Sequence, residues 1–567
     1  MSQRMQQGQP MIIMGEDAQR VKDRDAQEYN ISAARGVAEA VRSTLGPKGM
    51  DKMLVDSTGD VTITNDGVTI LQTMDIDNPT AEMIVEVAET QEDEAGDGTT
   101  SAVAVAGELL KNAEDLLEQD IHPTAVIKGF NLASEFARQE VDDVATTVDP
   151  DDTATLQSVA ETSMTGKGAE LEKDVLADLV VRSVQGVTVE ADDGSHVVDL
   201  QNLNIETRTG RSAGESRLLS GAVVDKDPVH DDMPTDFEEA NVVLLNDPIE
   251  VEEADVDTSV NVDSPEQLQQ FLDQEEAQLR EKVDQIVDAG ADVVFCQKGI
   301  DDLAQHYLAK EGVLAVRRTK KSDMKFLKNV LDTTIVTDLD SLSAADVAVG
   351  SVERDADEEL FYVEGENPHG ATLLIYGSTD HVVDELERGI NDAIDVVATT
   401  VSDGRILPGG GAIEVELASR LRDYADSVSG REQLAVEAFA DAVDIIPRTL
   451  AENAGLDPID SLVDLRSKHA DGDDGAGLDA YTGEVIDMDD EGVVEPLRVK
   501  TQAIESATEA AVMILRIDDV IAAGDLKGGS SDDDDEDGGP GGAPGAGGMG
   551  GMGGGMGGMG GGMGGMM

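Results

Sequence analysis

The chain has 567 residues and a mass of 59.7 kDa, which exceeds what one hydrophobic core supports and favours roughly two to four domains. Its 41 Lys and Arg residues face 119 Asp and Glu residues, and the net charge of −78 excludes nucleic acid and anionic membranes as favourable partners. Aromatic residues make up 2% and tryptophan is absent, so the interior must be built from Val, Leu, Ile, Ala and Met.

The acidic excess runs through the whole chain while apolar residues recur at regular spacing, which favours a folded protein with an acidic surface over a disordered one. Such a surface resembles that of proteins from a salt-rich cytoplasm, where abundant cations screen the repulsion. The single cysteine, Cys296, excludes an intramolecular disulfide and fits a reducing compartment. No stretch approaches the ~20 apolar residues of a membrane span, so a cytoplasmic protein is expected.

The N-terminal part is predicted to be mostly helical. Apolar residues at helical spacing predict helices over residues 26–45, 102–117 and 124–145. Gly46-Pro47 ends the first helix, and Thr99 begins the second. The β-rich runs 61–64 and 68–71 flank the turn sequence Asn65-Asp66-Gly67, and together they predict a β-hairpin.

The middle of the chain, from about Gly221 to Gly370, alternates short apolar runs with helical patterns, which predicts an α/β unit. Its strands are expected at residues 242–245, 293–295 and 313–316. The segment 247–262 is acidic and lacks core residues. Ser264-Pro265 and Gln267 then supply the N-cap, first-turn proline and capping box of a long helix, so a protrusion is predicted.

The C-terminal part is predicted to be helical until about Asp525. Its helices are expected over residues 382–400, 432–454 and 500–516. On the first of these, Arg388, Asn391, Asp392 and Asp395 form a polar face opposite the apolar one. The acidic run and the Gly-Gly-Met tract that follow cannot bury a core, so we expect a disordered tail.

Four glycine-containing segments are candidates for ligand binding, although none is a standard nucleotide fingerprint. Gly96-Asp97-Gly98-Thr99-Thr100-Ser101 has the strongest signal, because glycines, hydroxyls and a helix N-terminus bind phosphate and an aspartate can hold Mg²⁺. Helix capping explains this segment equally well. Taken alone, Thr44-Leu45-Gly46-Pro47-Lys48-Gly49 fits a helix stop, and Asn65-Asp66-Gly67 fits a tight turn. Pro408-Gly409-Gly410-Gly411 fits either a hinge or a phosphate or ribose contact.

Together these segments carry a family resemblance. The motifs are Thr44 to Lys52, Thr64-Asn65-Asp66-Gly67, Gly96 to Thr100, Pro408 to Ala412 and Glu495 to Gln502. In this order they resemble the chaperonin family, and more closely the archaeal group II chaperonins, the thermosomes. The resemblance extends from about residue 15 to 525.

The resemblance implies an α/β multidomain chaperonin fold whose domains are discontinuous in the sequence. The implied domains are a mostly helical equatorial ATPase domain (1–149 and 406–527), a small intermediate domain (150–219 and 372–405) and an α/β apical substrate-binding domain (220–371) with a helical lid protrusion near 247–280. Residues 528–567 would remain outside as a tail.

The resemblance also implies a nucleotide site with ATP, Mg²⁺ and K⁺ as cofactors. The residues that would line the nucleotide are Thr44, Leu45, Gly46, Pro47, Asn65, Gly98, Thr99, Thr100, Ser101, Lys167, Gly410, Leu478, Asp479, Ala480 and Glu495. Asp97 would hold Mg²⁺, and Asp66 would lie near the γ-phosphate and help to orient water. Lys167 resembles a lysine that senses the γ-phosphate, although a solvated loop lysine is an equally good interpretation.

Asp392 has two interpretations. Its place on a polar helix face in an acidic chain favours a solvated surface residue. Asn391-Asp392-Ala393, however, resembles the segment whose aspartate positions the attacking water in the family. Phosphoryl transfer needs in-line water, a neutralising metal and little covalent chemistry from the protein, so Asp392 and Asp97 would suffice.

These features favour an ATP-hydrolysing chaperone that binds and encloses unfolded polypeptides. Its partners would be identical or paralogous subunits in a double ring, without nucleic acid or membrane. The alternative is a nucleotide-binding ring or scaffold without folding activity, which would not need the set Asp66, Asp97 and Asp392. A small-molecule ATP-dependent enzyme is disfavoured, because the 7 histidines form no cluster in the sequence.

The charge generates a first prediction. A ring of subunits that each carry −78 brings many like charges together, and the Debye length is ~30 Å at ~0.01 M salt but ~3 Å at ~1 M. We therefore expect ring assembly and ATP hydrolysis to require molar salt, as measured by sedimentation and phosphate release. An intact ring in dilute buffer would contradict this expectation.

Overall fold

The computed structural model describes residues 20–22, 24–55, 59, 61–167, 172–251, 265–365 and 370–521. Residues Val21–Val520 form one compact unit. The predicted N-cap Ser264, most of the acidic segment before it and the predicted tail 528–567 lie outside the described residues.

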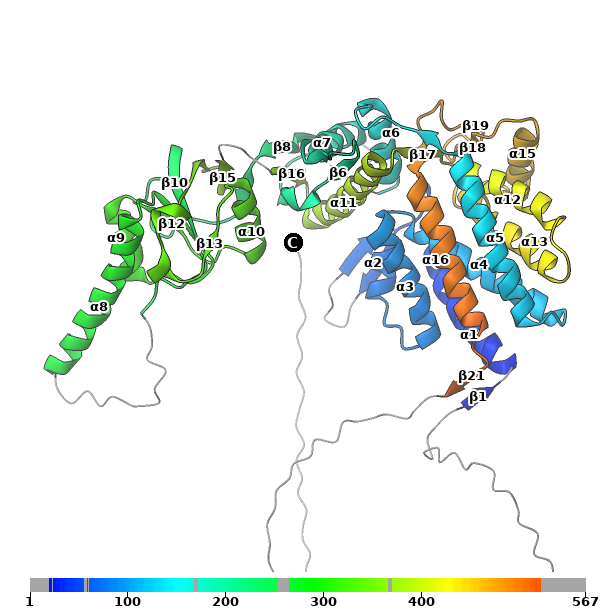
Figure 1. Ribbon diagram of the computed structural model, residues 1–567, viewed down its shortest axis with the longest axis horizontal. Coiled ribbons are helices and arrows are strands. Elements are labelled where there is room, and N and C mark those ends of the chain that lie inside the picture. Colours follow the sequence, from blue (N-terminus) through cyan, green and yellow to red (C-terminus); the bar gives the residue numbers. More distant parts are fainter. Residues whose placement is uncertain are drawn as a thin grey trace, which may run out of the picture. The chain divides into compact units, whose positions relative to one another are not determined.

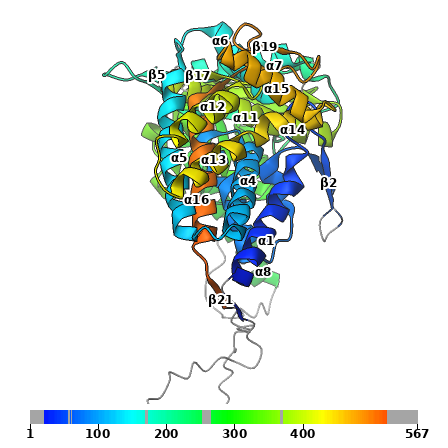
Figure 2. The same ribbon diagram turned by 90° about the vertical axis from the view of Figure 1, so that its right-hand side faces the viewer.

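Long helices lying side by side form the first hydrophobic core (Figure 2). They are α1 (Arg24–Arg42), α3 (Pro79–Ala95), α4 (Thr99–Glu118), α5 (Pro123–Val144), α12 (Ala412–Ala425), α13 (Glu432–Val443), α14 (Ile445–Asn453) and α16 (Leu497–Leu515). α4 is the central helix, because every residue from Ala102 to Leu110 is buried and no face is left for solvent. Gly107 lets α1 approach closely, since a Cβ at this position would lie 2.4 Å from the Cβ of Ala38.

These elements confirm most of the predicted helices, with one difference near the C-terminus. The helix expected over 432–454 is two helices, α13 and α14, which meet at Asp444. Pro447 has no N–H to donate to the carbonyl of Val443, and this missing hydrogen bond favours a break in the helix here. The fully buried Asp444 carboxylate accepts hydrogen bonds from Arg422 and Arg466 at this junction.

The predicted hairpin around Asn65-Asp66-Gly67 is wrong. β3 (Val61–Thr64) pairs with the strand before it, β2 (Lys52–Val55), and residues Gly67–Thr73 form the helix α2. Asp66 is the N-cap of this helix, and its Oδ2 accepts from the Thr69 N–H at 2.9 Å. The Asn-Asp-Gly sequence suits a helix start as well as a tight turn, and burial of the apolar side chains at helical spacing decides for the helix.

A seven-stranded mixed sheet forms the second core, drawn in green in Figure 1. Its strands, in spatial order, are β12 (Leu314–Val316), β11 (Val293–Cys296), β10 (Phe237–Leu245), β14 (Ala348–Asp355), β15 (Leu360–Gly365) and β9 (Ala222–Val224), with β13 (Ile335–Val336) also beside β10. Its helices are α8 (Pro265–Asp288), α9 (Asp302–Glu311) and α10 (Lys321–Val330). Strands β10, β11 and β12 are parallel and fully apolar where they pair, which confirms the predicted α/β unit.

The third core combines helices with a three-stranded sheet. Its elements are α6 (Thr153–Met164), α7 (Lys173–Gly186), α11 (Asp380–Asp403), β7 (Leu203–Thr209), β16 (Ala371–Gly377) and β8 (Arg217–Ser220). The helix α11 confirms the helix predicted over 382–400. The polar face of α11 is not uniformly solvated, however, because Asp392 is only 6% exposed. The interpretation of Asp392 as a surface residue is therefore wrong.

A further small sheet positions the site. It pairs β17 (Arg405–Pro408) with β20 (Val494–Pro496) and with β4 (Thr146–Thr147), and it places Leu407 opposite Glu495. The remaining described elements are β1 (Arg20–Lys22), β5 (Thr188–Glu190), β6 (His196–Val198), β18 (Ala476–Leu478), β19 (Val485–Asp487), β21 (Asp519–Ile521), α15 (Pro458–Ala470) and the 3₁₀ helices η1 (Leu200–Asn202), η2 (Ala213–Glu215), η3 (Leu339–Ser341) and η4 (Ala344–Asp346).

Candidate nucleotide-binding site

A cavity of about 450 Å³ collects residues from segments that are far apart in the sequence. All residues that the family resemblance assigned to the nucleotide, together with Asp66 and Asp97, line this cavity. Asp392 does not line it but contacts Lys167, which does. Sequence reasoning missed the apolar part of the wall, which includes Ile446, Ile486 and Met488.

The N-terminus of α4 opens into the cavity. Its N-cap, Gly98, has a left-handed backbone (φ 81°) and offers no side chain to the first-turn N–H groups. These N–H groups have no partner within the helix, so they and the positive end of the helix dipole are available to an anion. Another residue cannot replace Gly98 without strain, since a Cβ there would also lie 2.8 Å from Val499. The segment from Gly98 to Ser101 thus has the geometry of a phosphate site.

Asn65 and Asp66 bring a second loop to the same place. The Asn65 side-chain amide donates to the Gly166 carbonyl oxygen at 2.5 Å, which ties this loop to the one that carries Lys167. Asp66 caps α2 through one oxygen. Gly67 lies directly against the phosphate segment, because a Cβ on it would be 2.6 Å from the Thr100 hydroxyl oxygen. The two loops and the α4 terminus therefore form one continuous wall.

Lys167 connects two carboxylates at this wall. Its Nζ lies 2.5 Å from Asp392 Oδ2 and 3.4 Å from Asp97 Oδ1. Burial would lower the pKa of Lys167, but the negative charges of Asp392 and Asp97 outweigh it and raise that pKa, so the amine stays charged. The interpretation of Lys167 as a solvated loop residue is wrong, because its side chain is 16% exposed.

Carboxylates are in excess around this lysine. Burial raises the pKa of Asp392 to about 7, with Lys167 opposing the shift and the charges of Asp97 and Asp66 adding to it. Burial and the same three aspartates raise the pKa of Glu92 on α3 to about 9. Sequence reasoning missed Glu92, although it stands one helical turn before Gly96-Asp97. A hard divalent cation such as Mg²⁺ fits this oxygen-rich set, because it would relieve the mutual repulsion of the carboxylates.

The opposite wall carries the residues that the resemblance placed around the adenosine. Leu478, Asp479 and Ala480 follow one another at the end of β18, and the Leu478 N–H donates to the Gly410 carbonyl oxygen at 2.9 Å. Gly410 has a positive φ of 61°, and a Cβ there would lie 2.8 Å from Met488. This wall combines apolar side chains with backbone groups, as a purine and its sugar require.

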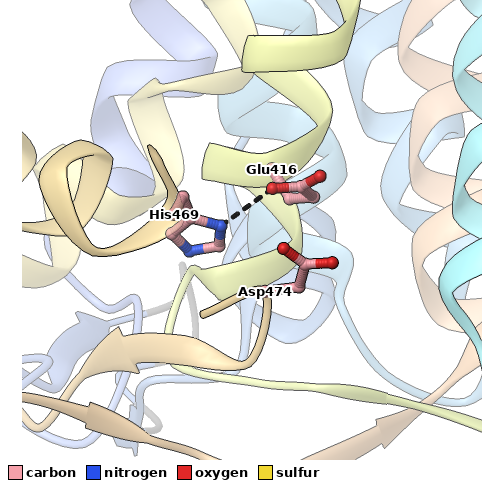
Figure 3. Close-up of side chains that lie close together, drawn as sticks. All are labelled: Glu416, His469 and Asp474. Atoms are coloured by element: carbon pink, nitrogen blue, oxygen red, sulfur yellow. Dashed lines mark hydrogen bonds and ion pairs between the residues drawn. The ribbon is translucent and has the colours of Figure 1, made fainter. Parts of the chain in front are cut away.

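His469, Glu416 and Asp474 lie close together behind this wall (Figure 3). The ring of His469 contacts Glu416 Oε2 through Nδ1 at 3.0 Å and the Ala476 carbonyl oxygen through Nε2 at 2.8 Å. Arg420 donates to the other oxygen of Glu416 at 2.6 Å. Burial would raise the pKa of Glu416, but the hydrogen bonds from Arg420 and His469 outweigh it and lower that pKa. The group therefore anchors β18, and with it the cavity wall that includes Leu478, to α12 and α15.

The fold is that of the chaperonin class. The chain belongs to the TCP-1/cpn60 chaperonin family, whose model matches residues 37–525. Within that family it is a group II chaperonin subunit, and members of this class are ATP-dependent ring chaperones. Among the described residues, none of the helices combines the length and hydropathy that crossing a membrane requires.

Individual relatives support this assignment. The chain is 75% identical to thermosome subunit 2 of Haloferax volcanii, over 94% of this chain and 96% of that protein. It is 72% identical to thermosome subunit beta of Halobacterium salinarum, over 92% of this chain and 95% of that protein. The open-state monomer of a group II chaperonin from Methanococcoides burtonii matches with a TM-score of 0.59 and 44% identity, over 74% of this chain and all of that one. The haloarchaeal sources agree with the acidic composition.

The anchoring role of His469 is testable. We expect His469→Ala to speed amide hydrogen exchange over Ala476–Leu478 by about tenfold, because the strand loses a buried hydrogen bond and Glu416 loses a partner. Hydrogen-exchange mass spectrometry in molar salt measures this, with His196→Ala on the β5–β6 hairpin as the control. Unchanged exchange in the His469 variant would show that β18 is held by other contacts.

Proposed function

We propose that this chain binds ATP with Mg²⁺ in the cavity described above and hydrolyses it to drive protein folding. The observation that supports this most strongly is the Lys167 bridge, which holds Asp392 beside Asp97 and the N-terminus of α4. A helix N-terminus binds a phosphate, a carboxylate set binds Mg²⁺, and a buried carboxylate nearby can orient water. K⁺ is a further proposed cofactor.

Each residue would have a distinct part in hydrolysis. Asp97 would hold Mg²⁺, which when bound neutralises phosphate charge. The first-turn N–H groups of α4 and the hydroxyls of Thr99 and Thr100 would hold the phosphate oxygens. Asp392, helped by Asp66, would orient the attacking water and accept its proton. Lys167 would donate to the terminal phosphate of ATP, which would replace Asp392 as its anionic partner.

The three cores support a division into domains. We propose that the helical core is the equatorial ATPase domain, that the core around α11 is the intermediate domain, and that the mixed sheet with α8 is the apical domain that binds unfolded polypeptide. Identical or paralogous subunits would form the double ring. Because Lys167 and Asp392 belong to the intermediate domain in this division, nucleotide binding would be coupled directly to domain movement.

The alternative is a ring that binds nucleotide without turning it over or folding a client. A scaffold of this kind needs the residues that would hold the phosphates, such as Thr99, and those that would hold the adenosine, such as Leu478. It does not need a buried carboxylate such as Asp392. The costly burial of that carboxylate therefore favours hydrolysis.

Two variants separate binding from chemistry. Asp392→Asn keeps the shape of the side chain, so we expect ATP·Mg²⁺ affinity to hold while turnover falls by ~10²-fold or more, as for loss of a positioned base. Asp97→Asn should instead weaken the Mg²⁺-dependent part of ATP binding. Asn391→Ala, exposed on the same helix, is the matched control and should keep both properties.

Affinity is measured by calorimetry and turnover by phosphate release, both in molar KCl. Wild-type turnover in Asp392→Asn would contradict the catalytic role, and a wild-type protein that binds ATP without hydrolysing it would favour the scaffold.

A further inference from the structure

An ion triad of two buried side chains and one partly buried side chain lies at the wall of the candidate nucleotide cavity. Lys500, in the first turn of α16, places its Nζ 2.8 Å from Glu414 Oε1 on α12 and 2.8 Å from Glu495 Oε2 on β20. The Lys500 and Glu414 side chains are 9% and 8% exposed. Both Lys500 and Glu495 line the cavity, so this triad belongs to its wall.

With both glutamates ionised, the triad carries one more negative than positive charge, although burial raises the pKa of Glu495 against the opposing effect of Lys500. Burial would lower the pKa of Lys500, but Glu414 and Glu495 outweigh it and raise that pKa, so the amine remains charged. Glu414 Oε2 is buried and has no hydrogen-bond partner among the described residues. Lys500 is therefore the group that allows the buried Glu414 carboxylate to lie close to the partly buried Glu495 carboxylate.

The first turn of α16 also reaches the phosphate end of the cavity. The fully buried Gln91 on α3 donates through Nε2 to the Asp97 carbonyl oxygen at 2.7 Å and to the Val499 carbonyl oxygen at 3.1 Å. Val499 thus fixes the segment before α4, while its neighbour Lys500 fixes Glu495. The first turn of α16 therefore contacts both the segment before α4 and the Glu495 side chain.

The free oxygen of Glu495 points toward the glycine loop after β17. A Cβ on Gly409 would lie 3.1 Å from Glu495 Oε1, so a glycine here leaves room for the carboxylate. Glu495 accepts from Lys500 through Oε2, and Oε1 remains as an acceptor. Because Lys500 fixes the position of the Glu495 carboxylate, Oε1 can accept hydrogen bonds from hydroxyl groups. The ribose of a nucleotide has two such groups, at the 2′ and 3′ positions.

We propose that Lys500 is a positioning and specificity-determining residue, which holds Glu495 as the acceptor for the ribose hydroxyls and limits the negative charge beside a bound nucleotide. This inference rests on the proposed function. It assigns two separable effects to one ammonium. The positioning effect acts on the choice between sugars, and the charge effect acts on the affinity for any anionic nucleotide.

The experiment compares ATP with 2′,3′-dideoxyATP, which lacks both hydroxyls, by calorimetry with Mg²⁺ in molar KCl. The wild-type protein should bind ATP about tenfold or more tightly than the dideoxy analogue, because the analogue leaves Glu495 Oε1 without its hydroxyl donors. In Lys500→Met this preference should fall toward unity, and ATP affinity should drop by about tenfold or more because both carboxylates lose their cation. Glu495→Gln should reduce the preference as well, and the two changes should not add when combined.

A second variant keeps the test open if Lys500→Met does not fold. Glu414→Gln/Lys500→Met has the same net charge in the triad as the wild type, so it should recover part of the ATP affinity but none of the preference for ribose. The control is Lys111→Met on α4. The Lys111 ammonium lies 2.6 Å from Glu108 Oε1, and neither residue lines the cavity, so this substitution should change neither the ATP affinity nor the preference for ribose.

Several outcomes would overturn the inference. A wild-type ribose preference in Lys500→Met or in the double variant, equal losses of affinity for both nucleotides, or additive effects with Glu495→Gln would reduce Lys500 to a structural role. Tight ATP binding by the wild type without any ribose preference would also overturn it, while leaving the proposed function intact. A wild type that binds no ATP would instead refute the proposed function.

Discussion

The ion pair between Lys167 and Asp392 is the interaction on which the candidate site depends. The two residues are 225 positions apart in the sequence, and the same ammonium also reaches Asp97 before α4. Without this cation, Asp66, Asp97, Asp392 and Glu92 would repel one another in a medium that screens poorly. With it, a helix N-terminus that suits phosphate and a buried carboxylate that suits water activation lie side by side.

The Lys167–Asp392 ion pair matters because buried carboxylates, unlike those on the surface, cannot be neutralised by dissolved cations. At −78 the exterior relies on dissolved cations for neutralisation, but such ions do not reach groups packed inside the fold. The interior therefore needs cations of its own. Lys167 and Lys500 form ion pairs with carboxylates at the cavity, and Arg422 and Arg466 form ion pairs with the buried Asp444. Lys167, Lys500 and Arg422 are each paired with two carboxylates.

The main elements could be predicted from local sequence patterns, which are apolar residues at helical spacing or short continuous apolar runs. The helices α1, α4, α5, α11 and α16 and the strands β10 to β12 all follow from local pattern. Local pattern failed at Asn65-Asp66-Gly67, where a helix start and a hairpin turn use the same residues. It also failed at Pro447, whose missing donor splits one predicted helix into two.

The site was less predictable, for a physical reason. The family resemblance named residues that do line one cavity, but local periodicity assigned Asp392 to solvent and gave no signal for Glu92, Glu414 or Lys500. The environments of these side chains depend on partners from other elements of the fold, so they exist only in the folded chain. Lys500 and Glu414, for example, meet because α16 and α12 both face the cavity.

We propose that a nucleotide occupies this cavity with its phosphates at the α4 terminus and with Asp392 directed at the attacking water. An electron cryo-microscopy structure of the purified protein in molar KCl with ADP, Mg²⁺ and aluminium fluoride tests this most directly. The account predicts a ring in which Asp97 binds the metal and the Asp392 carboxylate lies within hydrogen-bond reach of the water in line with the fluoride group. Nucleotide bound elsewhere, or Asp392 turned to solvent with the water held by another residue, would contradict it.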